Sequence, residues 1–275
     1  MLLSDFAEYS LLNSSELSTE RQKKAVLELQ LNILQVEIHA LDALTFVHQE
    51  LDKYTSHGAD HSWGIIDNLH DFLLKWNLKI SPQEAYLLYY CAWFHDIGNL
   101  IDRENHHIES CKIIERIPDY LRLAGKNGNW LPQIQTIIKY HRSKTEFGEI
   151  SEDIQFNKIK LLAAIFRLMD GIDIRSTRCP EIVYNIIKER LELNEVSNNK
   201  WIAHQLINTF VWNYNTLNIY LKKSDHCQFE NYKDFFDKII GKEMNEDILK
   251  INRVFNEFNL PDINLNIVET IQPSV

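Results

Sequence analysis

Histidine and aspartate residues recur along the chain in an order that could build a metal centre. His95 and Asp96 end a nearly apolar run, YYCAWFHDIGNL at residues 89–100, where burying an unpaired carboxylate would be costly. A divalent ion would neutralise Asp96, because imidazole and carboxylate ligands bind such ions and leave positions open for water. The candidate metal ligands are, in chain order, His61, His95, Asp96, His106, His107, His141 and Asp170. His107 is the alternative to His106 if the helix register differs by one residue.

Each candidate alone also has an ordinary structural interpretation. A lone histidine such as His61 at a helix start is usually a capping or surface residue, and His95–Asp96 alone could be a hydrogen-bonded core pair. His141 would end a helix, where cations are favoured. His95 and Asp96 would point about 100° apart on a regular helix, so they can share a site only where the helix ends, and Gly98 supplies such an end. The order of the whole set favours a metal site.

Helices are the elements expected to position these residues. The chain of 275 residues has only 8 Gly and 6 Pro, which favours long helices over many turns. Ser81 and Pro82 form a helix start, with Ser81 as the N-cap. Apolar residues three or four apart predict helices over 17–54, 60–73, 82–94, 106–117, 132–141, 157–169, 180–193, 201–222 and 232–258, with a short helical turn at 118–123.

No strand-like alternation persists along the sequence, so the predicted class is all-α, a helical bundle. We expect an N-terminal helical segment at 1–54, a catalytic core at 55–180, a C-terminal helical extension packed on the core at 181–258, and an irregular tail at 259–275. The extension is rich in aromatic residues, which indicates a second core or a dimer surface. Its helices are therefore the candidate surface for a homo-oligomer.

The charge and cysteine content limit the partners of the protein. The 39 acidic and 29 basic residues give a formal charge of -10, which disfavours a long nucleic acid, because duplex-DNA binders are usually basic. A small phosphorylated or nucleotide substrate is compatible with this charge where a metal supplies local positive charge.

The four cysteines have no CxxC spacing and indicate ordinary thiols. We see no leader peptide and no apolar run long enough for a membrane, so we expect a cytoplasmic protein.

Five sequence blocks carry the candidate ligands: DHSWGI, FHDIGN, the following LIDRENHHIESCKII, IIKYHRSK and FRLMDGID. In this order they resemble the HD-domain superfamily of metal-dependent phosphohydrolases, whose H…HD…D signature matches His61, His95–Asp96 and Asp170. The two extra histidine blocks are typical of members with a two-metal centre. The run AAIFRLMDGIDIRSTR is similar to a helix of exopolyphosphatase C-terminal domains and of stand-alone or conflict-system HD proteins. The resemblance covers about residues 55–180.

The resemblance implies an HD-domain helical bundle and a mechanism. Its first metal would be held by four residues: His61, His95, Asp96 and Asp170. Asp96 would bridge to a second metal held by His106 and His141. The divalent ions, whether Mn, Fe, Co, Ni or Mg, would lie ~3.5–4 Å apart and generate a bridging hydroxide as the nucleophile.

Two departures from the family pattern narrow this expectation. Asn99 follows HDIG where many relatives that act on cyclic dinucleotides have a lysine, and no GYP sequence occurs. Both points argue against a cyclic di-GMP phosphodiesterase of the HD-GYP type. Tyr140–His141–Arg142 stands where the family has His-His-Glu, so a cation replaces one potential ligand, which argues against a third metal.

The candidate catalytic residues are His57, Asp96, Arg103, Arg142 and Arg178, since arginine suits bidentate contact with phosphate. His57 precedes His61 by four residues and would share its helix face if the helix starts early. It could then protonate the leaving oxygen or contact phosphate, although TSHGAD equally indicates a loop. Arg167 is expected to pair with Asp173 or another structural carboxylate.

The predicted function is a metal-dependent phosphohydrolase that cleaves a phosphoester or phosphoanhydride bond of a small nucleotide-like substrate. Two alternatives stay open. A single-strand nuclease is disfavoured by the acidic balance of the chain. A non-catalytic, metal-stabilised signalling or scaffold module is disfavoured because every ligand block is present. We expect the specificity for the substrate to lie in the loops at 99–106, 124–131 and 143–156.

Overall fold

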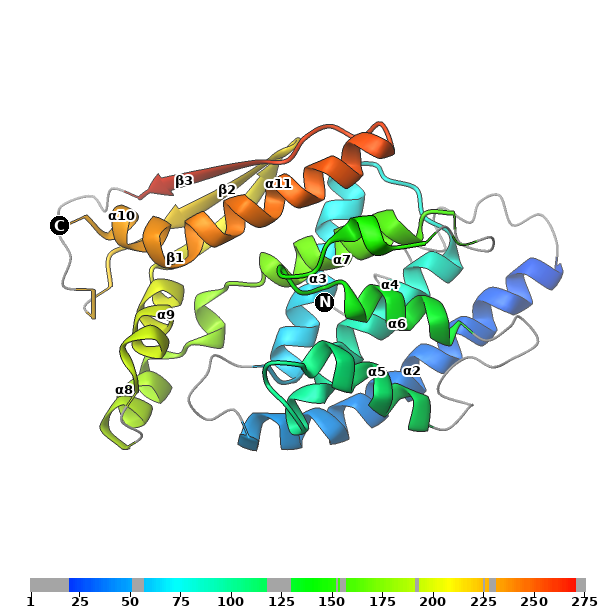
Figure 1. The fold of residues 1–275 in the computed structure, drawn as a ribbon, viewed down its shortest axis with the longest axis horizontal. Coiled ribbons are helices and arrows are strands. Elements are labelled where there is room, and N and C mark those ends of the chain that lie inside the picture. Colours follow the sequence, from blue (N-terminus) through cyan, green and yellow to red (C-terminus); the bar gives the residue numbers. More distant parts are fainter. Residues whose placement is uncertain are drawn as a thin grey trace.

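A computed structural model of the chain describes residues 20–50, 57–117, 130–151, 153, 157–190, 193–224, 226–227 and 231–270. Most of these residues are helical, as the sequence predicts, and a small three-stranded sheet lies near the C-terminal end (Figure 1). The helical turn predicted at 118–123 lies outside the described residues.

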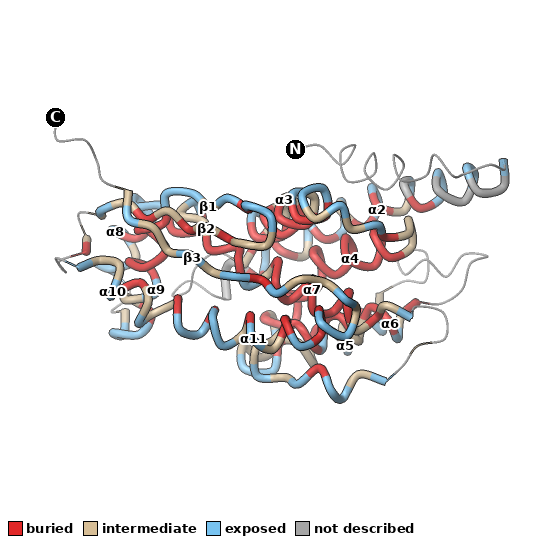
Figure 2. Tube along the Cα trace, turned by 90° about the horizontal axis from the view of Figure 1, so that it is seen from above, coloured by how far each residue is buried: buried red, intermediate tan, exposed pale blue. Residues whose placement is uncertain are grey.

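The helices that surround the candidate ligands come from the first two thirds of the chain. They are α2 (Glu20–Glu50), α3 (Ala59–Lys75), α4 (Pro82–Phe94), α5 (His106–Arg116), α6 (Leu131–Lys139) and α7 (Ile159–Gly171). Three 3-10 turns, η1 (Ile97–Leu100), η3 (Phe147–Glu149) and η4 (Ser176–Arg178), join them. Figure 2 shows the buried residues gathered along α4 and α7, the two helices at the centre of this bundle.

Helix α4 has buried residues on every face, which explains why its sequence is almost wholly apolar. Its start is fixed as the sequence predicts. The backbone N–H of Glu84 donates to the Ser81 hydroxyl at 3.2 Å, and the backbone N–H of Ser81 donates to the Glu84 carboxylate at 2.6 Å. This capping box sets where the helix begins and, thirteen residues on, where His95 ends it.

The helix predicted at 201–222 is wrong beyond its first turns. Helix α9 (Glu195–Gln205) stops, and the chain continues as the hairpin of β1 (Ile207–Asn213) and β2 (Thr216–Leu221). Every second residue of β2 is buried, an alternation typical of a strand with one face on the core. Tyr214 in the connecting turn has a φ of 53°, which a helix cannot contain.

The tail was also predicted incorrectly as irregular. Strand β3 (Asn264–Glu269) pairs in parallel with β2, so the sheet has the order β1-β2-β3. Asn252 of α11 (Lys242–Glu257) holds the chain just before β3, because its side chain bonds both the N–H and the carbonyl of Ile263. Residues 264–269 are therefore held by partners distant in sequence, which a local pattern does not reveal.

The remaining helices are α8 (Glu181–Arg190), α10 (Tyr232–Phe236) and α11, and a π-helical turn, η5 (Asp237–Gly241), joins the last two. The predicted helix at 232–258 thus exists, with this turn inside it. Helix α11 packs along α7 of the core (Figure 1). Helix α11 therefore lies against the same bundle that carries the candidate ligands.

An aromatic cluster fastens the extension to the core. Phe72 and Trp76 of α3 meet Trp212 of β1, with ring centroids 5.5 and 6.2 Å from it, and Phe255 of α11 completes the group. These rings bury large apolar surfaces against one another. Trp212 therefore lies in an internal core, which is one of the two interpretations predicted for the aromatic residues of the extension.

Among the described helices, none combines the length and the apolar content needed to cross a membrane.

Candidate metal centre

The candidate ligands all sit at or next to helix ends, and these ends meet at one place. His61 lies in the first turn of α3, His95 caps the end of α4, and His106 begins α5. His141 follows the end of α6, and Asp170 lies in the last turn of α7. Five helices therefore direct one or more polar side chains into a common region of an otherwise apolar bundle.

A tight turn lets His95 and Asp96 face the same region. The chain passes from α4 through Asp96 into the 3-10 turn η1, so the two side chains do not keep helical spacing. The Ser110 hydroxyl donates to the His95 carbonyl at 2.6 Å and accepts from the Gly98 N–H at 2.8 Å. A Cβ atom on residue 98 would lie 2.1 Å from the backbone oxygen of His106. Only glycine permits this approach of the turn to α5.

Four histidines are oriented in the same way. In each, Nδ1 faces an acceptor of the protein: Asp173 Oδ2 at 2.7 Å from His61, the Cys91 carbonyl at 3.2 Å from His95, the Arg103 carbonyl at 2.8 Å from His106, and the Ile138 carbonyl at 2.5 Å from His141. A carbonyl or an ionised carboxylate can only accept, so Nδ1 carries a hydrogen in each ring, and Nε2 keeps a lone pair where the ring is neutral. Histidines that bind metals are commonly held in this way.

The Nε2 atoms converge on the two carboxylates. His61 Nε2 lies 3.0 Å from Asp170 Oδ1, and His106 Nε2 lies 3.2 Å from Asp96 Oδ1. His106 Nε2 and His141 Nε2 are 3.0 Å apart. Neutral rings held through Nδ1–H would direct their lone pairs at one another and at carboxylate oxygens. A cation is what these donors require, so the residues fit a metal.

The surroundings of His95 also require a positive charge. Its Nε2 is buried without a hydrogen-bond partner, 3.4 Å from Asp96 Oδ2 and 3.7 Å from Asp170 Oδ1. Burial lowers the pKa of His95, but the attraction of the Asp96 and Asp170 carboxylates outweighs it and raises the pKa to about 10. A protonated ring between two carboxylates supplies the positive charge that a divalent ion would supply there. Three overlapping groups of side chains each have their ligand atoms within 4.8 Å of one another, close enough to hold one ion. These groups are His57, His61 and Asp96; His61, His95 and Asp170; and His95, Asp96 and His141.

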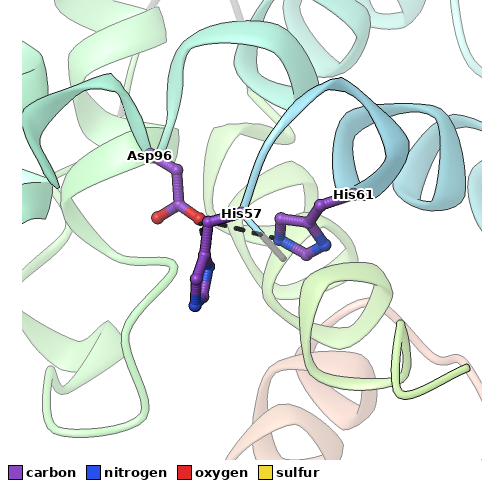
Figure 3. Close-up of side chains that lie close together, drawn as sticks. All are labelled: His57, His61 and Asp96. Atoms are coloured by element: carbon purple, nitrogen blue, oxygen red, sulfur yellow. Dashed lines mark hydrogen bonds and ion pairs between the residues drawn. The ribbon is translucent and has the colours of Figure 1, made fainter. Parts of the chain in front are cut away.

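His57 joins the site from the residues just before α3. Figure 3 shows the rings of His57 and His61 near the Asp96 carboxylate. Asp96 Oδ2 lies 2.9 Å from His57 Nδ1 and 3.8 Å from His61 Nε2. The other ring nitrogen, Nε2, lies 3.5 Å from a guanidinium nitrogen of Arg103. Burial lowers the pKa of His57 to about 3 despite the nearby Asp96. The ring is therefore neutral at pH 7 in the free protein. In this state it can hold Asp96 and Arg103 through its two nitrogens, but it cannot act as a general acid.

The structure separates His106 from its neighbour His107. His106 Nε2 lies 3.2 Å from Asp96 Oδ1 and 3.0 Å from His141 Nε2. Neither His106 nor His107 belongs to the described groups of three side chains that could hold one ion. The ring centroids of His107 and His141 are 6.4 Å apart. Burial lowers the pKa of His107 to about 4. The geometry therefore favours His106 for the second ion.

The arginines divide into two groups. Arg103 and Arg142 line the cleft beside the ligands. Arg103 donates to the Asn99 side chain at 3.2 Å, and Asn99 in turn donates to the Asp96 carbonyl, so the residue that departs from the HDIG-Lys pattern positions Arg103. Arg142 donates to the Glu104 carbonyl. Both guanidinium groups therefore border the space in front of the ligands.

Arg167 and Arg178 have structural partners. Arg167 pairs with Asp247 of α11 and donates to the Ser143 and Thr145 carbonyls. Its predicted pairing with a carboxylate is present, with Asp247 instead of Asp173. Arg178 is buried against Asp173, donating to its carbonyl at 2.5 Å, and does not line the cleft. Its predicted contact with phosphate stays a prediction.

A cleft of about 330 Å³ opens from the ligands toward the extension. One side carries His57, Asp96, His106, His141 and Asp170, and the opposite side is formed by α9, the π-helical turn and α11. Its size is in the range of small-molecule sites, roughly 300–1,000 Å³. Of the three loops predicted to set specificity, 99–106 contributes Arg103 and His106 to the cleft and 143–156 contributes Ser143. Most of the third loop, 124–131, lies outside the described residues.

Three residues of this region were not predicted as part of the site. Asp173 holds His61, Asp247 anchors Arg167, and His204 of α9 lines the cleft. Asp173 carried a local signal, because it lies three residues after Asp170 in MDGID, just beyond the end of α7 at Gly171. Asp247 and His204 come from the extension and had no local signal.

Comparison with known proteins agrees with this arrangement. No curated protein matches the chain. The sequence profile of the HD-CE family, an HD-type domain, matches residues 51–245. This match covers the ligand blocks and continues through α9 and the hairpin into α11, beyond the stretch that the motifs alone indicated. It spans well over half of the chain, and the chain therefore belongs to the HD-CE family.

Proposed function

We propose that this protein is a metal-dependent phosphohydrolase that cleaves a phosphoester or phosphoanhydride bond of a small nucleotide-like substrate. The observation that carries the proposal is the set of four histidines whose Nδ1 atoms are held by protein acceptors while their Nε2 atoms converge on Asp96 and Asp170. Such a donor set suits a pair of divalent ions, Mn, Fe, Co, Ni or Mg.

The residues divide between the two ions by position. His61, His95, Asp96 and Asp170 would hold the first ion, and Asp96, His106 and His141 the second. When bound, such ions lower the pKa of water and polarise a phosphoryl oxygen. Asp96 suits a bridging role because its Oδ2 lies toward His57 and His95 while its Oδ1 lies toward His106. Its two oxygens therefore point to the two halves of the site.

The other residues of the chain bind the substrate. Arg103 and Arg142 line the cleft next to the ligands and would contact the phosphate oxygens as cationic donors. His57, neutral at pH 7, would keep Arg103 and the Asp96 carboxylate in place through its two ring nitrogens. Its low pKa favours this positioning role over proton donation in the free protein.

We treat the core at 55–180 and the extension at 181–258 as one working unit, because both contribute walls to the cleft. A small substrate is favoured over a long nucleic acid by the formal charge of -10. All four cysteines are free thiols, which suits a reducing compartment, and we propose the cytoplasm.

Hydrolysis by the metal-loaded protein tests the proposal. The protein is stripped with a chelator, reloaded with each of the candidate metals, and assayed for phosphate release from nucleoside monophosphates, triphosphates and cyclic nucleotides. The matched variants are His95→Ala, in the site, and His70→Ala, on α3 away from it. We expect turnover with at least one metal, lost in His95→Ala and kept in His70→Ala. Metal uptake without turnover on any substrate would favour the scaffold alternative, and turnover confined to oligonucleotides would favour the nuclease.

A further inference from the structure

The cleft has two unlike halves. The half formed by the candidate ligands is charged and suits a phosphate. The opposite half presents aliphatic side chains, Ile239 and Ile240 from the π-helical turn and Met244 and Ile248 from α11. Three charged residues, Lys200 of α9 and Glu243 and Asp247 of α11, also line this half. Aliphatic side chains offer a phosphate group no hydrogen bond and no ion pair, so this wall is suited to a different part of a ligand.

Ile239 and Ile240 are presented by an unusual stretch of backbone. The π-helical turn lies inside an otherwise continuous helix, between α10 and α11. Such turns occur frequently at functional sites, because the extra residue redirects the side chains that follow. Both isoleucines are only half-buried, although they lie beside a buried cluster. They therefore leave apolar surface available within the cleft.

His204 adds a polar group to this wall. It lines the cleft from α9 and is 8% exposed, and its Nδ1 has no hydrogen-bond partner. The ring bonds the Ile174 backbone through its other nitrogen, which therefore carries the hydrogen. Burial lowers the pKa of His204 to about 3, so Nδ1 remains an acceptor at pH 7. A buried acceptor without a donor in the protein is suited to a donor on a ligand.

We propose that this wall binds the organic group of the substrate, a nucleobase-sized planar ring that packs on Ile240 and Met244 and donates an N–H to His204. This inference rests on the proposed function for the position of the phosphate. It selects nucleotides over inorganic polyphosphates and over sugar phosphates, which have no such ring to bury.

Equilibrium binding tests this inference without turnover. The affinities of AMP and UMP are measured by calorimetry beside that of ribose 5-phosphate, which lacks the base. The variants are His204→Phe, which keeps the ring volume and removes the acceptor, and Ile240→Glu, which places a carboxylate on the half-buried wall. Leu249→Glu, on an exposed face of α11, is the matched control. Circular dichroism and metal content show whether each variant keeps its fold and its ions.

We expect at least one nucleotide to bind wild-type protein about tenfold more tightly than ribose 5-phosphate, with this difference lost in both cleft variants and kept in Leu249→Glu. Equal affinities in wild-type protein, including no binding of either, would overturn the inference, as would an unchanged difference in both variants. If the protein hydrolyses phosphate compounds with and without a base equally well, the inference about the base is overturned and the proposed function stands. If a nucleotide binds preferentially but is not hydrolysed with any metal, the proposed function is overturned and the inference about the base stands.

A second inference comes independently from α2. This helix buries one face on the core, through Leu29, Ile33, Val36, Ala40, Leu44 and Val47. The opposite face exposes an apolar stripe of Leu27, Leu31, Leu34, Ile38 and Leu41, between 36% and 64% exposed. The residues of this stripe are spaced four and three apart in alternation, the heptad pattern that packs against another helix.

Charge along α2 favours a second copy in the opposite direction. Lys24 lies toward its start and Asp42 toward its end, and both are exposed. Of the other charges on α2, Lys23 pairs with Glu20 on the same helix, and Glu37 accepts a hydrogen bond from the Tyr89 hydroxyl of α4. Two antiparallel copies would bring Lys24 of each helix toward Asp42 of the other, over a helix of 31 residues that is about 46 Å long. Figures 1 and 2 show α2 on the side of the molecule away from α11, so pairing leaves the cleft open. The geometry points to an antiparallel homodimer through α2.

Sedimentation velocity over a concentration series tests the dimer. We expect wild-type dimer, monomer for Leu31→Glu/Ile38→Glu with unchanged helicity, and wild-type behaviour for Leu249→Glu. Lys24→Glu should weaken the dimer, and adding Asp42→Lys should restore it. Monomeric wild-type protein would overturn the inference. A dimer that survives the stripe variant, or that is dissolved by Leu249→Glu, would also overturn it and would favour the C-terminal helices instead.

Discussion

His61 Nδ1 lies 2.7 Å from Oδ2 of Asp173, a carboxylate with no exposed surface. Burial raises the pKa of Asp173, but the bond from His61 and the charge of Arg178 outweigh it and keep the pKa below its ordinary value. Arg175 also donates to Asp173, at 2.9 Å. An ionised acceptor thus fixes the ring so that Nε2 faces Asp170. Asp173 acts on the metal centre through His61, as a positioning residue.

Replacing this carboxylate should weaken metal binding while leaving the ligands themselves in the chain. We expect Asp173→Asn to reduce metal affinity by about 10–100-fold, the range typical of partners that orient a metal-bound histidine. A competition titration against a metal-binding dye measures this. Asp71→Asn is the control, since Asp71 is half exposed on the same helix as His61. Unchanged affinity in a folded Asp173→Asn protein would contradict the positioning role.

His106 and His107 should differ in their effect on metal content. Because His106 faces Asp96 and His141, His106→Ala should lower the content from about two ions per chain to about one. His107→Ala should leave the content unchanged. Elemental analysis after reconstitution and desalting gives the answer. A loss in His107→Ala with none in His106→Ala would reverse the assignment.

The arginines of the cleft should affect turnover more than metal binding. We expect Arg103→Ala and Arg142→Ala each to reduce kcat/KM by about 10²-fold or more, because each removes a cationic donor beside the phosphate. Metal content should stay the same. Arg116→Ala, at the end of α5, serves as the control. Equal kcat/KM in Arg142→Ala and in the control would show that Arg142 does not contact the substrate.

Acid should destabilise the fold partly through His204. Burial, with Arg178 nearby, lowers its pKa to about 3 in the folded protein, whereas the unfolded chain takes up this proton below about pH 6.5. The stabilisation from the neutral ring is thus present above pH 6.5 and is lost as the pH falls toward 3.

At pH 5 this loss corresponds to about 2 kcal/mol, at about 1.4 kcal/mol for each pKa unit. Thermal unfolding with a chelator present, at pH 7.5 and pH 5, measures it. His204→Phe cannot take up the proton, so its Tm should fall less between the two pH values than that of the wild type. An equal fall in both proteins would show that His204 does not titrate in this way.

The sequence allowed the core of the site to be predicted because its signals are local. A histidine at a helix start, the His95–Asp96 pair before Gly98, and the capping box at Ser81 each depend on neighbouring residues. The structure brings these candidates together and adds what their order alone did not reveal, the common orientation of the histidine rings.

The errors came from contacts between distant parts of the chain. The helix predicted at 201–222 failed because Leu217, Ile219 and Leu221 are buried by a sheet whose third strand begins at Asn264. His204 and Asp247 approach the ligands only because α9 and α11 fold back on α7. Packing across such distances leaves no periodic trace in one sequence, so the far wall of the cleft could not be predicted.

Metal content of the purified protein tests the central claim most directly. Elemental analysis of wild-type protein, His95→Ala and His70→Ala, each after reconstitution, requires no knowledge of the substrate. We predict about two divalent ions per chain in the wild type and in His70→Ala, and a clear loss in His95→Ala. No bound metal in reconstituted wild-type protein, or equal content in all three, would contradict the assignment of these residues to a metal centre.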